Sequence, residues 1–170
     1  DMYEKLLVDF PKKSDLYFDL VELYGSQREY EKALGTLKEI ETVFGMTESI
    51  AVYRFNLLRM LDRHEEAFKS LEEYNEDYSS PFILSTLADY QMSMYNDSTA
   101  LAYYDEALSL ESDYAPALLG KAETFRITRR YDEYFDTLYE YIDGDGASMQ
   151  AKADYLMAVL QRTDPKFIRS

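Results

Sequence analysis

Apolar residues recur along this chain with the spacing of an α-helix. They fall three or four positions apart, which places them on one face of a helix and does not match the strict alternation of a β-strand. Each run lasts about 12 to 15 residues, an ordinary helix length. The first two runs are Leu16, Leu20, Leu23 and Tyr24, then Ala33, Leu34, Leu37 and Ile40. The pattern predicts a chain of amphipathic helices.

Residues that start or stop helices separate these runs. Ser80-Pro81 and Asp164-Pro165 each place a capping side chain before a proline at the first helical position, and Ala115-Pro116 has the proline without the cap. The run Asp143-Gly144-Asp145-Gly146 is the strongest helix breaker in the sequence. We therefore expect short turns between helices and no long linker.

Alanines in similar sequence contexts recur at a fixed interval. Ala33, Ala67 and Ala100 are 34 and 33 residues apart, and one more step of 34 residues reaches Tyr134. A period in this range predicts an array of helix–turn–helix repeats, in which each repeat contacts mainly its neighbours.

When the repeats are aligned on this period, they resemble the tetratricopeptide repeat (TPR) family across nearly the whole chain. Small residues stand where paired helices would cross, and aromatic residues would fill the space between successive pairs. The resemblance implies an all-α, right-handed superhelical solenoid of antiparallel helix pairs. The residues that match the packing positions of the family are Tyr17, Leu20, Tyr24, Tyr30, Ala33, Leu37, Ala67, Leu71, Ala88, Ala100, Tyr104, Ala107, Ala122, Phe125, Tyr131 and Leu138.

Several positions depart from the family pattern. Tyr134 stands where alanine is expected, and none of the turns between paired helices has the usual glycine. We expect either a wider helix pair at Tyr134 or a ring that turns toward the next repeat. His64 occupies the position of Tyr30 and Tyr131, which predicts a packing residue near a turn.

The period predicts one continuous array whose two ends fall within repeats. Residues 1–13 match the second helix of a truncated repeat, and residues 149–170 the first helix of another, with Asp164-Pro165 starting its second. Because a lone helix leaves an apolar face open, we expect a segment of a longer protein, the alternative being a short protein with half-repeat caps. The complete repeats are predicted at 14–47, 48–80, 81–114 and 115–148.

The composition narrows the choice of partner. The chain has 18 basic and 33 acidic residues and a formal charge of −15, which disfavours nucleic acid and anionic membrane surfaces. Solubility alone also accounts for such a charge. There is no cysteine, so no disulfide or thiolate site is possible. No signal peptide or membrane-spanning run is visible, and the compartment stays undetermined.

The sequence gives little support for catalytic or metal-binding groups. His64 is the only histidine, and adjacent carboxylates such as Glu65-Glu66 do not share a helix face. Asp143-Gly144-Asp145-Gly146 invites a calcium interpretation, but Asp154 is the twelfth residue where an EF-hand loop needs glutamate. A plain turn is the stronger interpretation. We expect no enzyme activity, no metal and no cofactor.

The resemblance also implies where a ligand would lie. In the family the first helix of each pair lines a concave groove. The corresponding residues here are Phe18, Glu22, Val52, Asn56, Arg59, Ser85, Asp89, Met92, Leu119, Glu123, Arg126 and Met157. Some family members clamp a terminal carboxylate with Lys and Asn in this groove. One row of these residues along the groove is mostly acidic, with one Asn and no Lys: Glu22, Asn56, Asp89, Glu123 and Met157. A peptide with basic residues and an apolar anchor therefore fits this groove better than a terminal carboxylate does.

Two functional hypotheses remain open at this stage. The first is a protein-interaction module that holds an extended segment or a helix of a partner in its groove. The second is a structural spacer, or a segment that self-associates through its open ends, within a larger protein. Neither hypothesis identifies the partner.

Overall fold

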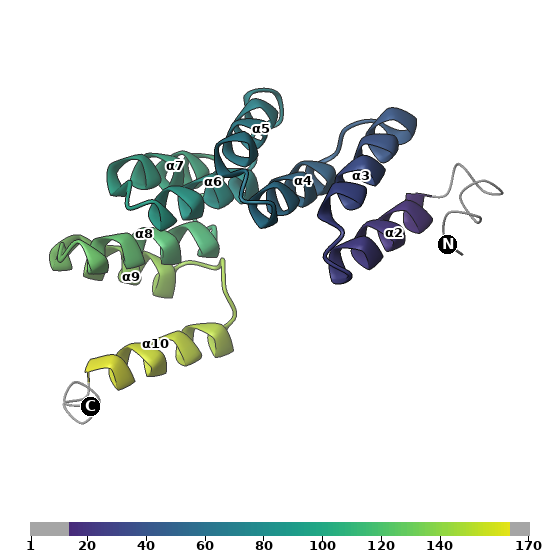
Figure 1. Cartoon of the computed structure of the whole chain (residues 1–170). Helices are drawn as coiled ribbons and strands as arrows, with labels where there is room; N and C mark the ends of the chain where they lie inside the picture. The colour runs from purple at the N-terminus through teal and green to yellow at the C-terminus, as the bar shows by residue number, and fades with distance from the viewer. Residues whose placement is uncertain (1–13, 164–170) are drawn as a thin grey trace. The chain divides into compact units, whose positions relative to one another are not determined.

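The computed structural model describes residues 14–163, and all regular secondary structure within that range is α-helical (Figure 1). The predictions for residues 1–13 and 164–170 lie outside the described residues. The helices are α2 (Ser14–Ser26), α3 (Tyr30–Phe44), α4 (Glu48–Met60), α5 (His64–Asp77), α6 (Pro81–Ser93), α7 (Asp97–Leu110), α8 (Ala115–Ile127), α9 (Tyr131–Asp143) and α10 (Met149–Thr163).

Contacts divide the chain into two compact units. The first unit ends at Ser79 and contains α2 to α5, and the second begins at Ser80 and contains α6 to α10. Helices α2 and α3, and α4 and α5, pack in pairs within the first unit. Helices α6 and α7, and α8 and α9, do so within the second. Each pair is joined by a turn of only a few residues.

The repeating alanines lie where the helices of a pair meet. Ala33, Ala67 and Ala100 are completely buried. A methyl group at such a crossing lets two helices approach closely, whereas a larger side chain would push them apart. Of the thirteen other residues that match packing positions, eleven are buried and Tyr30 is half-buried, whereas Tyr131 is exposed. The eleven are Tyr17, Leu20, Tyr24, Leu37, Leu71, Ala88, Tyr104, Ala107, Ala122, Phe125 and Leu138.

Tyr131 is therefore a correction to the predicted packing set. Its side chain begins α9, and 53% of its surface is exposed. His64 is a second correction, because it is exposed and its Nε2 lies 2.7 Å from Oδ1 of Asp62 in the preceding turn. Both residues begin the second helix of a pair.

Each turn between paired helices uses the same strained backbone residue. Arg28, Asp62, Tyr95 and Arg129 have φ of 60°, 60°, 59° and 60°, and they recur at the period of the repeat. The amide that follows each of them donates to the carbonyl five residues earlier, at 2.8 to 2.9 Å. This is the Schellman arrangement that normally places glycine at the left-handed position. The turns thus keep the geometry that glycine favours without containing glycine.

Capping agrees with the helix starts and stops expected from sequence. The Oγ of Ser80 accepts a hydrogen bond from the amide of Ile83 at 3.2 Å, with Pro81 at the start of α6. Helix α9 ends at Asp143, and the amide of Gly144 donates to the carbonyl of Glu140 at 3.0 Å. The Asp143–Gly146 run is thus the end of a helix followed by a turn.

Tyr134 occupies the crossing position that alanine takes in the other pairs. Its side chain is buried in a cluster with Ala122, Phe125 and Leu138, so it remains part of the α8–α9 core. Tyr155 of α10 packs against the same cluster. The Tyr134 ring therefore contacts both its own helix pair and the first helix of the next repeat.

Within residues 14–163, no helix combines the length and apolar character needed to cross a membrane.

Candidate functional site

The predicted groove residues differ widely in their accessibility. Ser85 is buried, and its Oγ has no hydrogen-bond partner, so it is a correction to the predicted groove surface. Glu22, Asn56, Arg59, Asp89 and Met157 are exposed, whereas Phe18, Val52, Met92, Leu119, Glu123 and Arg126 are half-buried.

In the second unit, three of these residues line one pocket. The pocket has a volume of about 350 Å³ and brings together Asp89 and Met92 of α6 with Glu123 of α8. Its other walls are Ser93, Tyr104, Gly120 and Ile127. Three of the predicted first-helix residues thus lie around one open pocket, with two carboxylates beside apolar side chains.

Asp89 accepts a hydrogen bond from a buried tyrosine of the adjacent helix. The hydroxyl of Tyr104 in α7 donates to Oδ1 of Asp89, while the ring of Tyr104 is almost completely buried. Burial raises the pKa of the Asp89 carboxyl, and the hydrogen bond from Tyr104 partly opposes that rise. Burial also raises the pKa of Tyr104, as does its bond to Asp89, so the proton stays on the tyrosine oxygen.

Glu123 is in a different electrostatic state from Asp89. The guanidinium of Arg126, one turn later in α8, donates to Glu123 with Nε 2.9 Å from Oε2, and Nη1 of Arg162 lies 3.7 Å from the same oxygen. The hydrogen bond from Arg126 lowers the pKa of Glu123 despite partial burial. Among the described residues no basic side chain pairs with Asp89, so Asp89 carries the uncompensated negative charge of the pocket.

Met92 and Thr124 shape the apolar side of this pocket. The hydroxyl of Thr124 lies 3.0 Å from Sδ of Met92 and donates to the carbonyl of Gly120 at 2.8 Å. Ile127, at the end of α8, completes the apolar wall and remains exposed at its outer edge. A long side chain that ends in a cation could lie on Met92 and Ile127 and reach Asp89.

In the first unit, the groove residues form an aromatic and acidic patch. The rings of Phe18 in α2 and Tyr53 in α4 lie 5.9 Å apart between centroids. The hydroxyl of Tyr53 donates to Oε1 of Glu22 at 3.0 Å. Arg59 lies over the ring of Phe55, 5.3 Å from its centroid.

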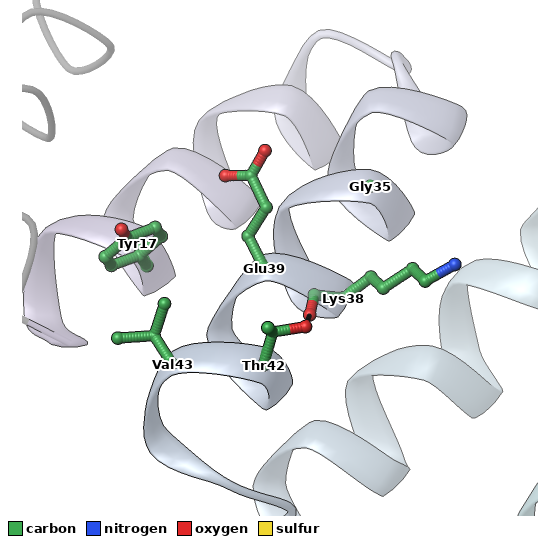
Figure 2. A pocket seen from close by; sticks show the side chains of 6 residues that line it. All are labelled: Tyr17, Gly35, Lys38, Glu39, Thr42 and Val43. Carbon is green, nitrogen blue, oxygen red and sulfur yellow. Dashed lines mark hydrogen bonds between the residues drawn. The ribbon is translucent and has the colours of Figure 1, made fainter.

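A larger cavity of the first unit lies away from the predicted groove row. It has a volume of about 540 Å³ and lies between α2 and α3, and Figure 2 shows Tyr17 and Val43 pointing toward one another across it. Gly35, Lys38, Glu39 and Thr42 complete its lining. Of these residues, only Tyr17 was singled out from the sequence, and it was predicted to pack rather than to bind.

Sequence reasoning missed several residues of the second-unit pocket. Gly120 and Ile127 are not among the residues predicted for the groove, and Tyr104 was expected only to pack. A signal was present for Tyr104, because a buried tyrosine needs a polar partner for its hydroxyl. Within residues 14–163, no cluster of three or more side chains is suited to a metal ion.

Comparison with known proteins rests on structure alone. No protein-family model matches the chain, and a search of curated proteins finds no significant match. Among solved structures, the chain is similar to PilF of Pseudomonas aeruginosa, with a TM-score of 0.65 and 18% identity over 95% of this chain and 75% of that one.

Two further structures give comparable matches. PilW, a type IV pilus biogenesis factor, matches with a TM-score of 0.64 and 18% identity over 96% of this chain and 83% of that one. YrrB, described as a TPR protein with an unusual peptide-binding site, matches with a TM-score of 0.59 and 15% identity over 96% and 86%. Identities this low establish the fold and not a shared ligand. This chain therefore has the tetratricopeptide repeat fold, built from divergent repeats.

Proposed function

We propose that this chain is a non-catalytic protein-binding module whose groove takes a peptide segment of a partner, with a basic side chain beside an apolar anchor. The observation that supports this most is Asp89. Asp89 lines a pocket with an apolar wall, and its carboxylate accepts a hydrogen bond from the neutral hydroxyl of Tyr104. A lysine or arginine would supply the missing positive charge.

The chemistry of the pocket fits recognition better than catalysis. Asp89 and Glu123 are both acceptors, and their partners in the described part of the chain are the hydroxyl of Tyr104 and the guanidinium groups of Arg126 and Arg162. The hydroxyl of Tyr104 has a raised pKa, which opposes its use as a base. A preformed cavity that needs no chemical step suits a binding role, as does a fold that recurs in a TPR protein with a peptide-binding site.

The test uses two short extended peptides that differ in one feature. Both carry leucines at alternate positions, and the intervening residues are lysines in one and glutamates in the other. Titration calorimetry should detect binding of the lysine peptide only. Asp89→Asn should weaken that binding about tenfold, because it removes the charge and keeps the shape.

Asp77→Asn is the matched control, because Asp77 is an exposed aspartate of α5 outside this pocket. It should leave the affinity unchanged. Preferential binding of the glutamate peptide, or equal losses in the two variants, would show that the groove does not recognise basic residues through Asp89.

A further inference from the structure

The outward side of α9 carries a ladder of three exposed aromatic rings. Tyr131, Phe135 and Tyr139 are four residues apart, which places them on one face of the helix. The exposed fractions of their side chains are 53%, 54% and 66%. Three large rings open to solvent along one helix form a continuous apolar surface, which is unusual unless something covers it.

The other repeats show that packing does not require this ladder. One repeat period before Tyr139 stands Asp105, and earlier steps reach Glu72 and Lys38, all of them exposed charged residues. The positions that correspond to Phe135 are Leu34, Phe68 and Leu101, and each of these is half-buried. The ring of Tyr139 and the exposure of Phe135 are thus particular to α9.

A pocket of about 440 Å³ continues the ladder toward α10. Tyr131, Tyr134 and Phe135 line it from α9, and Val159 and Leu160 line it from α10. Helix α10 leaves this space open because it packs lightly. Between residues 149 and 162 only Lys152 is buried, and its Nζ donates to the carbonyl of Gly144 at 2.5 Å. The pocket could therefore receive an apolar side chain of another molecule.

The two flanks of the ladder differ in charge. Along one flank run Asp132, Asp136 and Glu140, with Asp143 at the end of the helix, and all four are exposed. Within the part of the chain that the structure describes, no ion pair neutralises these four carboxylates. The other flank is the pocket, whose Arg126 and Arg162 share Glu123. A covering molecule should therefore place its cations only on the first flank.

We propose that the outer face of α9 is a second docking surface, which takes an amphipathic helix of another protein. An aliphatic stripe of that helix covers Tyr131, Phe135 and Tyr139 and sends one side chain into the pocket. Lysines or arginines beside the stripe pair with Asp132, Asp136 and Glu140 and lie against the rings. This surface is separate from the Asp89 pocket, so it does not depend on the proposed groove function.

Charge also decides between this occupant and a second copy of the chain. Each copy carries a formal charge of −15, so two copies would bring like charges together around the same acidic flank. A basic helix would instead bring positive charge to the acidic flank, so the interaction would be attractive. Complementary charge in turn aligns the helix, because its cations must avoid Arg126 and Arg162.

The probe for this proposal is a synthetic amphipathic helix of about five turns that carries leucines on one face, lysines beside them and one tryptophan. The chain itself has no tryptophan, so probe fluorescence reports binding directly. A second probe replaces every lysine by glutamate. We expect the lysine probe to bind and the glutamate probe to fail.

Substitutions on α9 test whether the probe binds to that helix. Tyr139→Ser should weaken the lysine probe about tenfold, and Asp136→Asn with Glu140→Gln should weaken it by a similar factor. Tyr95→Ser removes a tyrosine with 88% exposure at a turn outside this face and should change nothing. Asp77→Asn, which removes an exposed carboxylate of α5 outside both surfaces, should also leave the probe affinity unchanged.

Three outcomes overturn the proposal. They are no binding of the lysine probe, equal losses in Tyr139→Ser and Tyr95→Ser, and light scattering that shows dimers abolished by Tyr139→Ser. The last outcome would mean that a second copy covers the ladder. Because Tyr139 is exposed, its substitution should leave the helical circular dichroism intact, so that a lost signal reports binding and not unfolding.

Discussion

Gly120 of α8 lies directly against the ring of Tyr104 in α7. A β-carbon at position 120 would stand 2.4 Å from Cε1 and Cζ of that ring and 2.5 Å from its oxygen. The absence of a side chain at Gly120 therefore lets Tyr104 extend beneath α8 and donate to Asp89. One glycine thus connects the packing of a helix pair to the charge at the surface of a pocket.

Gly120→Ala should destabilise the protein by about 1–3 kcal/mol, because the added methyl would displace a buried ring and strain its bond to Asp89. Urea unfolding measures the change. Gly35→Ala is the matched control, since no atom lies within 4 Å of a β-carbon at that helical position. It should stabilise the protein by about 0.5–1 kcal/mol. A neutral or stabilising Gly120→Ala would contradict the close contact.

Arg129→Gly should stabilise the protein by about 0.5–1 kcal/mol. Arg129 has φ of 60° in the turn between α8 and α9, a conformation that strains a residue with a β-carbon. The gain is smaller than the strain because glycine also loses more entropy on folding. Arg129→Ala keeps the β-carbon and should change stability little. If the two variants unfold at the same urea concentration, the turn is not strained.

Tyr134→Ala should destabilise the protein by about 3–5 kcal/mol, although alanine is the residue at this position in the other three pairs. The buried ring fills the space between α8, α9 and Tyr155, so its removal leaves a cavity. Tyr134→Phe keeps the ring and loses only the hydroxyl, and it should cost about 1 kcal/mol. Thermal unfolding followed by circular dichroism ranks the two variants, and a stable Tyr134→Ala would show that the ring is dispensable.

Binding of the basic extended peptide should weaken as the pH falls through the raised pKa of Asp89, because protonation removes the attracting charge. Glu123, whose pKa is lowered, should remain ionised over that interval. Calorimetric titrations at pH 7 and at several lower values measure the effect, and Asp89→Asn should flatten the decline. An unchanged decline in that variant would assign it to another group.

The raised pKa of Asp89 makes the stability of the fold depend on pH in the direction opposite to that of peptide binding. A carboxyl whose pKa is higher in the folded state stabilises the fold below its unfolded pKa, and this contribution is lost as the pH rises through the folded pKa. Asp89→Asn should therefore be slightly more stable than the parent at neutral pH while it binds the basic peptide less well. Urea unfolding at neutral and mildly acidic pH checks the sign.

The sequence alone determined the helices and their phase. A period of 33 or 34 residues and an apolar spacing of three or four positions are local properties, because they follow from which face of a helix must be buried. The buried Ala33, Ala67 and Ala100 could be predicted for that reason. Left-handed turn residues at Arg28, Asp62, Tyr95 and Arg129 could not, since nothing local distinguishes them once glycine is absent.

Only the tertiary structure decided which side chains of each helix meet a neighbour and which stay open. Ser85 and Asp89 were both predicted in the groove, yet Ser85 is buried and Asp89 is exposed. Tyr131 and Tyr104 were both predicted to pack, yet Tyr131 faces solvent, and the buried Tyr104 also donates to an acid of the preceding helix, Asp89 of α6. The rotation and separation of packed helices set these outcomes, and they depend on side chains distant in sequence.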